Sequence, residues 1–238
     1  MATSASATFN LDLNAIVEEA FERCGAELRS GYDLRTARRS LNLMLLEWAN
    51  RGINLWTIEQ GSQVLTPGTA TYDIPVDTVD LIEHVIRTGT GSNQTDIDIS
   101  RISVSTYASI PNKTATGRPI QIYIDRKTGA TNSSSVVQYP TFTVWPVPDN
   151  SQTYTLVYWR LRRMLDAGSG TTTQDIPFRF LPCLVAGLAY YLALKIPGAE
   201  PRITMLKQMY DEAWVMAAEE DREKASVRFV PRQAFIGS

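Results

Sequence analysis

The sequence predicts an α+β protein that combines a discontinuous domain of four helices, an inserted antiparallel β domain and an extended C-terminal tail. Three observations predict this fold class. Helical periodicity occurs at both ends of the chain, alternating apolar residues occur between them, and residues 55–158 hold 27 of the 41 Ser and Thr. We expect residues 10–54 and 174–224 to form the helical domain, 55–165 the β domain and 225–238 a docking tail.

Two amphipathic helices are predicted before the β domain. The first should end between Gly25 and Gly31, and Asp33 can cap the second by accepting hydrogen bonds from its first N–H groups. Gly52 lies where a helix-terminating glycine belongs. The predicted apolar faces are Leu13, Ile16, Val17, Ala20, Phe21, Cys24 and Leu28 in the first helix, and Leu34, Ala37, Leu41, Met44, Leu45 and Trp48 in the second.

The middle of the chain alternates apolar and polar residues, which is typical of strands with one buried face. A Thr-Pro-Gly-Thr turn at residues 66–69 separates the first two alternating runs. The runs contain Val64 and Leu65; Tyr72 and Ile74; Ile97 and Ile99; Ile120, Ile122 and Ile124; Phe142 and Val144; and Tyr154, Leu156 and Tyr158. We therefore predict at least six short strands, mostly antiparallel.

The helical pattern returns after residue 173. Asp175 followed by Pro177 is a helix-start signal, and residues 180–194 are apolar on nearly all sides. This run is shorter than the ~20 residues that a membrane span requires, so we expect a buried helix and no membrane association. Pro201 should open the last helix, whose apolar side contains Ile203, Leu206, Met209, Tyr210, Ala213, Trp214 and Ala217.

The charge balance argues against a free-standing DNA-binding protein. Lys and Arg total 23 and Asp and Glu total 25, which leaves a net charge of −2 and no basic excess. The N-terminus shows no secretory signal, so we expect the protein to stay in the compartment where it is made. Cys24 and Cys183 match neither a disulfide framework nor a zinc motif, and their apolar helical faces predict buried thiols.

Few residues have the pattern of a catalytic or metal site, and we predict no enzyme activity, cofactor or metal. His84, the only histidine, lies in an apolar run that predicts a structural role. Asp96 and Asp98 could form a carboxylate pair for a cation or for hydrolysis, but alternating strands produce such pairs by default. The sequence at 89–92, GTGS, lacks the residues of a nucleotide-binding loop and predicts a loop tip.

Arginine dominates the basic residues, with 18 Arg and only 5 Lys. Arg forms planar paired contacts with carboxylates and is enriched at protein interfaces, whereas Lys suits a solvated surface. Two clusters are therefore candidate subunit-interface residues, with solvated helix faces as the alternative. The clusters are Arg35, Arg38 and Arg39 on the second helix, and Arg160, Arg162 and Arg163 after the β region.

The C-terminal tail has the composition of a docking segment. Residues 227–236 mix apolar residues with two Arg and contain no acid, whereas disordered termini are normally poor in aromatic and β-branched residues. Residues 227–238 can extend over ~40 Å. The residues predicted to contact a partner are Val227, Arg228, Phe229, Val230, Pro231, Arg232, Phe235 and Ile236.

Several segments of the chain, taken as a set, resemble the head-to-tail adaptor (connector) proteins of short-tailed bacteriophages, the podoviruses. The likeness covers roughly residues 11–224. The segments that carry it, in order, are SLNLMLLEWANRGINLWT (40–57), LTPGTATYDIP (65–75), TGRPIQIYIDR (116–126), TFTVWPVPD (141–149), YTLVYWR (154–160) and DIPFRFLP (175–182).

The resemblance implies a structural virion protein in the neck of a phage, assembled in the host cytoplasm. It implies a ring of twelve copies between the portal protein and the tail nozzle protein, with the helical part toward the portal. The ring would line a channel that retains packaged double-stranded DNA and passes it at ejection without specific binding. In this family the C-terminal segment grips the portal, which would assign portal binding to residues 227–236 here. The low net charge suits a channel wall that DNA must pass.

A different class of function is the alternative. The Ser/Thr-rich β domain could be a carbohydrate-binding or host-recognition module of a tail protein, with Trp145 and Trp159 as stacking platforms for sugars. A hydrolase that uses Asp96 and Asp98 is a third hypothesis.

Overall fold

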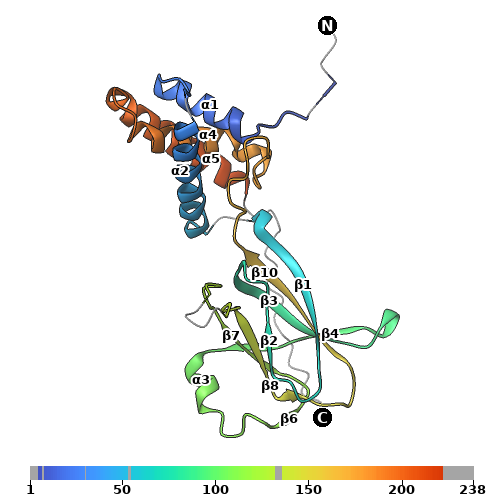
Figure 1. Cartoon of the computed structure of the whole chain (residues 1–238). Helices are drawn as coiled ribbons and strands as arrows, with labels where there is room; N and C mark the ends of the chain where they lie inside the picture. Colours follow the sequence, from blue (N-terminus) through green and yellow to red (C-terminus); the bar gives the residue numbers. More distant parts are fainter. Residues whose placement is uncertain (1–4, 7, 30, 53–54, 132–135, 222–238) are drawn as a thin grey trace. The chain divides into compact units, whose positions relative to one another are not determined.

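The chain folds into two compact units in a computed structural model, and the α+β fold class is confirmed (Figure 1). The helical unit consists of Met1–Leu55 and Ala167–Ser238, so it draws on both ends of the sequence. The β unit consists of Trp56–Asp166. The structure describes residues 5–6, 8–29, 31–52, 55–131 and 136–221.

The first two helices of the helical unit are α1 (Leu13–Cys24) and α2 (Gly31–Asn50). The Asp12 carboxylate caps α1 by accepting from the Ala15 N–H at 2.8 Å, and α1 ends as predicted, at Gly25 with a left-handed φ of 76°. The predicted cap of α2 is wrong: α2 already begins at Gly31, and Asp33 lies within its first turn. There the carboxylate accepts a hydrogen bond from the Arg29 N–H instead.

The other two long helices are α4 (Leu181–Ala193) and α5 (Ile203–Glu220). Two 3-10 turns lead into them, Phe178–Phe180 before α4 and Glu200–Arg202 before α5. Thus α4 begins six residues after the predicted start at Asp175, because the chain around Pro177 forms the 3-10 turn first.

Helix α4 is the centre of the helical unit. It packs against α1, α2 and α5, and most of its residues are buried, as its nearly continuous apolar run predicts. Gly187 lets the helices approach closely, because a Cβ there would lie only 2.8 Å from the Tyr210 ring of α5 and would also collide with Met44 of α2.

An aromatic cluster joins α2, α5 and the turn before α4. The rings of Trp48, Phe180 and Trp214 lie with centroids 5.0–6.0 Å apart. The Trp48 indole N–H donates to the Tyr210 hydroxyl at 2.7 Å, so the polar atom of the most buried tryptophan is satisfied. These contacts connect parts of the sequence that lie on either side of the β unit.

The β unit contains two four-stranded sheets and one short strand pair. The sheet orders are β1-β10-β3-β4, β2-β8-β7-β5 and β6-β9. All pairs are antiparallel except β5–β7 and β6–β9, which are parallel. The elements are β1 (Ile58–Leu65), β2 (Thr71–Asp73), β3 (Thr78–Thr88), β4 (Thr95–Asp98), β5 (Ser100–Ile102), α3 (Val104–Ser109), β6 (Thr116–Gly117), β7 (Gln121–Asp125), β8 (Thr141–Trp145), β9 (Val147–Pro148) and β10 (Tyr154–Arg162), with 3-10 turns at Leu55–Thr57 and Gly91–Asn93.

Side chains from both four-stranded sheets form one apolar core. It contains Leu65, Ile74, Leu81, Ile86, Ile99, Ile122, Ile124, Phe142, Val144, Tyr154, Leu156 and Tyr158. The alternation therefore identified most of the inward-facing residues correctly. Ile120 is an exception, because it precedes β7 and its side chain is exposed.

Candidate assembly surfaces

Helix α2 carries a line of exposed residues along the face opposite its buried side. We call Arg35, Arg39, Leu43 and Leu46 the α2 stripe. Successive members are four, four and three residues apart, which places them along one side of a helix. Leu43 and Leu46 are 52% and 47% exposed, which is unusual for two large apolar side chains in adjacent turns. Two of the three arginines predicted on this helix therefore adjoin exposed apolar surface.

The third predicted arginine of α2, Arg38, makes a contact within the helical unit. The Arg38 Nε–H donates to the Ala167 carbonyl oxygen at 2.9 Å, within the helical unit. The Ala167 N–H in turn donates to the Asn42 side chain at 2.7 Å. Arg38 therefore helps to hold the returning chain against α2.

Helix α5 carries a second exposed line, with apolar and acidic residues. We call Met205, Met209, Glu212, Met216 and Glu219 the α5 stripe. Met209 was predicted on the buried side, but it is 40% exposed because the core contacts of this helix are made by Leu206, Tyr210 and Trp214. A shallow groove of about 520 Å³ lies beside the stripe between Asp211, Glu212, Val215 and Met216. The α2 stripe is thus basic and apolar, and the α5 stripe is acidic and apolar.

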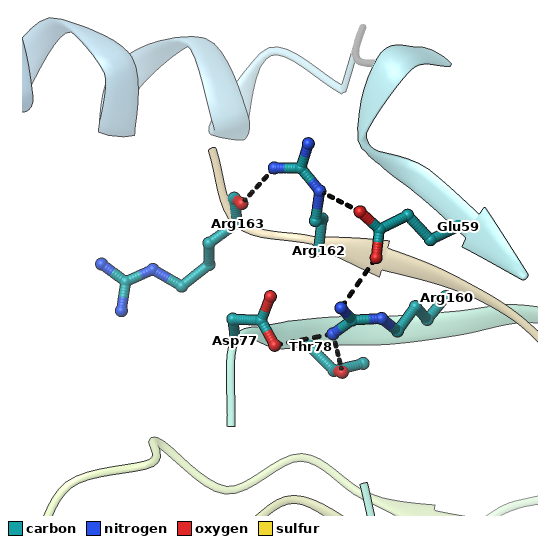
Figure 2. Close-up of polar contacts among 6 residues, drawn as sticks. All are labelled: Glu59, Asp77, Thr78, Arg160, Arg162 and Arg163. Atoms are coloured by element: carbon teal, nitrogen blue, oxygen red, sulfur yellow. Dashed lines mark hydrogen bonds and ion pairs between the residues drawn. The ribbon is translucent and has the colours of Figure 1, made fainter. Parts of the chain in front are cut away.

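The second arginine cluster lies at the paired ends of β1, β3 and β10 in the β unit (Figure 2). Arg160 and Arg162 are two residues apart on β10. The Arg160 guanidinium lies between two carboxylates, donating to Asp77 at 2.6 Å and to Glu59 at 2.8 Å. It also donates to the Thr78 hydroxyl at 2.9 Å, and Arg162 donates to Glu59 at 2.6 Å.

These contacts set the electrostatics of the cluster. The Arg160 and Arg162 side chains are only 13% and 11% exposed. Burial by itself raises the pKa of Glu59, but hydrogen bonds from Arg162 and Arg160 outweigh it, so the Glu59 pKa lies below its ordinary value of 4.5. The hydrogen bond from Arg160 likewise lowers the pKa of Asp77. Both carboxylates therefore stay ionised at neutral pH, and Arg160 and Arg162 are held inside the unit.

Arg163 differs from its two neighbours. Its backbone N–H donates to the Asp77 carbonyl at 2.8 Å, and its carbonyl accepts from Arg162 at 3.1 Å. The side chain is exposed, and within the described ranges no carboxylate pairs with its guanidinium. Of this cluster, Arg163 is thus the residue whose charge faces outward.

The acidic and histidine candidates lie on the neighbouring strands β3 and β4, with Asp98 opposite Val85, the residue after His84. Asp96 pairs with Arg87 across the β3–β4 strand pair, with two hydrogen bonds of 2.8 Å. His84 is buried on β3, and burial lowers its pKa. In the part of the chain that the structure describes, no group of three His, Cys, Asp or Glu could hold a metal ion. The predicted loop tip at residues 89–92 overlaps the short 3-10 turn Gly91–Asn93.

The structure also shows the surroundings of the two cysteines and of the two tryptophans predicted to stack on sugars. Burial raises the pKa of Cys24 to about 11 and that of Cys183 to about 12, which makes both thiols poor nucleophiles at neutral pH. Trp145 and Trp159 lie on different sheets, on β8 and β10. The Trp145 indole N–H donates to the Asn112 carbonyl at 3.0 Å.

The two remaining predictions concern the C-terminal tail and membrane association. The portal-binding tail, residues 227–236, lies outside the described residues. Among the helices that are described, none combines the length and apolar character that crossing a membrane requires.

Comparison with known proteins bears directly on the predicted adaptor. A family model described as SU10 adaptor protein matches residues 12–232, most of the chain. No curated protein matches the chain. The match spans both units and includes the ten strands and four long helices found among the described residues. It agrees with the resemblance to phage head-to-tail adaptors, and the chain belongs to the SU10 adaptor protein family, a family of structural phage adaptors.

Proposed function

We propose that this protein forms a closed ring in the neck of a phage virion, between the portal and the tail nozzle, around the channel that the DNA passes. The observation that carries the proposal is the pair of complementary exposed stripes on the helical unit. A ring requires two different surfaces on each copy that fit each other, because every subunit meets its neighbours head to tail. The α2 and α5 stripes are two such surfaces.

The two stripes complement each other in charge and in apolar character. Arg35 and Arg39 of one copy would face Glu212 and Glu219 of the next, and the exposed leucines would pack on the exposed methionines. Arg is suited to such contacts because its planar guanidinium pairs with carboxylates in a fixed geometry. Methionine adapts its shape to a partner surface, which suits a joint between repeated subunits. This pairing gives the predicted subunit-interface role to Arg35 and Arg39.

The number of copies and the partners come from the family resemblance. Twelve copies, a portal protein above and a nozzle protein below, form the arrangement that we propose. The net charge of −2 per chain supports a channel wall that does not retain DNA through phosphate contacts. The tail, residues 227–236, is the proposed portal contact.

Electron microscopy of the protein mixed with its portal tests the proposal. We expect a ring stacked on the portal, and a chain that stays monomeric beside the portal contradicts the proposal. Leu46→Glu should abolish the ring, because it places a charge in the apolar part of the joint. Val104→Glu is the matched control, since Val104 is 62% exposed on α3 and belongs to the β unit, which carries neither stripe. Equal ring formation by both variants would remove the α2 stripe from the joint.

The role of the tail has its own test. Truncation after Ala225 should leave the ring intact and weaken its attachment to the portal. Cosedimentation of rings with portal particles measures the attachment. Unchanged attachment would remove the tail from the portal contact.

A further inference from the structure

An apolar groove of about 570 Å³ opens at the start of α4, and none of its lining residues belongs to the α2 or α5 stripe. Its lining consists of Phe9, Leu11, Phe178, Leu181, Pro182 and Val185 and contains no charged residue. Phe9 and Phe178 are each 77% exposed. Two phenylalanine rings that border one apolar groove and remain in contact with water indicate a surface that another apolar segment covers.

The last described residue of the chain is anchored next to this groove. The Asp221 carboxylate forms an ion pair with Arg179, the residue directly after Phe178. The same carboxylate accepts from the Leu55 N–H at 3.1 Å, and Asp221 is 2% exposed. Asp221 is therefore held by the residue that follows the groove-lining Phe178 in the sequence.

The segment that follows has the composition and the length to fill the groove. Seventeen residues follow Asp221, and Phe229 is the first aromatic residue among them. The eight residues from Asp221 to Phe229 can extend over about 26 Å. Residues 227–236 contain Val227, Phe229, Val230, Phe235 and Ile236, and they lack acidic residues that an apolar groove would exclude.

We propose that in the free chain residues 227–236 dock into this groove of the same molecule, with Phe229 as the anchor. A short tether keeps the effective concentration of the tail near the groove in the millimolar range. Docking within one molecule is therefore favoured over docking between molecules at the micromolar concentrations of a dilute solution. The inference concerns the chain before it assembles and does not depend on the portal as a partner.

Site-specific photo-crosslinking tests the contact in the full-length free chain. Phe178 is replaced by p-benzoylphenylalanine, and the protein is illuminated at a concentration where it elutes as a monomer. We expect the crosslink to join position 178 to residues 227–236 of the same chain, with a yield that is constant over a tenfold dilution. The same probe at Tyr32, which is 66% exposed on α2, is the matched control and should not reach the tail.

Mixing isotopically light and heavy chains distinguishes the other occupants. Crosslinks between light and heavy chains would identify a second copy in the groove and overturn the proposal. Crosslinks from position 178 only to other segments, or no crosslink at all, overturn it as well.

Amide hydrogen exchange gives a second, independent measurement. In the wild-type chain the amides of residues 227–236 should be protected, and Phe178→Ser should speed their exchange at least tenfold. Phe229→Ser should act in the same way, and Tyr32→Ser should have no effect. Because Phe178 and Tyr32 are mostly exposed, both substitutions are expected to leave the fold intact. Equal exchange of the tail in all four proteins overturns the proposal.

Discussion

Substitution of Arg160 by methionine tests whether the arginine cluster of β10 stabilises the β unit. Methionine keeps much of the apolar length of the arginine stem and removes the guanidinium. The change therefore deletes the hydrogen bonds to Asp77, Glu59 and Thr78 while it preserves most of the packing. Arg163→Met is the matched control, because the Arg163 side chain is exposed and its structural contacts come from the backbone.

The expected magnitude follows from the exposure of the partners. Removing one member of a fully buried ion pair costs about 3–5 kcal/mol, because the other charge is left without a partner. Here the arginine is 13% exposed, but the Glu59 and Asp77 side chains are 43% and 37% exposed and can regain water. Because this solvent access reduces the cost, we expect Arg160→Met to lower the free energy of opening the sheet that pairs β1 with β10 by about 2 kcal/mol. Arg163→Met should change it by less than ~0.5 kcal/mol.

Native-state hydrogen exchange of the full-length chain measures this free energy at individual amides of the sheet that contains the cluster. The amides that pair β1 with β10 report the opening of the sheet that contains the cluster. A loss of about 2 kcal/mol corresponds to exchange about 30-fold faster, since each factor of ten is ~1.4 kcal/mol. If Arg160→Met accelerates this exchange no more than Arg163→Met does, the cluster does not stabilise the sheet and the reasoning is refuted.

Three further predictions address the helical core and the cluster. Gly187→Ala should lower the free energy of unfolding by about 1 kcal/mol, because overpacking against Tyr210 exceeds the gain in helix propensity. Gly31→Ala is the control: open space surrounds Gly31, so this variant should slightly raise the melting temperature. A Gly187→Ala protein that melts at a higher temperature than Gly31→Ala would contradict the packing argument. Tyr210→Phe should lower the free energy of unfolding by about 1–3 kcal/mol, because the Trp48 indole N–H loses its acceptor. Urea unfolding followed by tryptophan fluorescence measures this change. An unchanged urea midpoint would contradict the role of the hydrogen bond. In an NMR titration, the Glu59 carboxyl should have a midpoint below 4.5, because its hydrogen bonds to arginine lower its pKa in the folded state. The contribution of Glu59 to stability is therefore complete above pH 4.5 and disappears as the pH falls through the lower folded-state pKa. A midpoint at or above 4.5 would contradict the effect of these hydrogen bonds.

Helix positions were predicted more accurately than helix starts. The buried faces of α1 and α2 agree with the periodicity, because a repeat of three to four residues places side chains on one side of a helix whatever the tertiary context. The predicted cap at Asp33 and the predicted start at Asp175 are wrong. Such starts depend on local competition between turns, as in the 3-10 turn Phe178–Phe180 that precedes α4.

The β unit shows where local patterns stop being informative. Alternation identified the inward residues of β7, β8 and β10, but the short helix α3 and the parallel pair β5–β7 were not expected. In α3, the Ser103 side chain caps the helix by accepting from the Thr106 N–H, a local signal that was available in the sequence. A parallel pairing leaves no comparable local signal, since it depends on which distant strand becomes a neighbour.

The sequence alone determined the α+β class, the order of the four long helices and the strand-rich segment between them, and most of the residues that face a core. These properties are encoded by the spacing of neighbouring residues, and spacing is read within a few turns or a few strand residues. The same near-neighbour information placed arginines on α2, but it put Arg160, Arg162 and Arg163 after the β region, whereas Arg160 and Arg162 lie on the strand β10. The family resemblance rests instead on the segments between residues 40 and 182, and the match over residues 12–232 supports it.

Only the tertiary structure decided what those arginines do. Arg160 meets Glu59 across 101 positions of sequence, and Arg38 meets the Ala167 carbonyl across 129. Contacts over such separations depend on how the whole chain closes, because no local pattern relates the two partners. The folded helical unit alone shows that Arg35 and Arg39 continue into exposed leucines and that α5 exposes methionines beside acids. The charge imbalance between the two stripes, rather than the total of arginines, is what the structure adds.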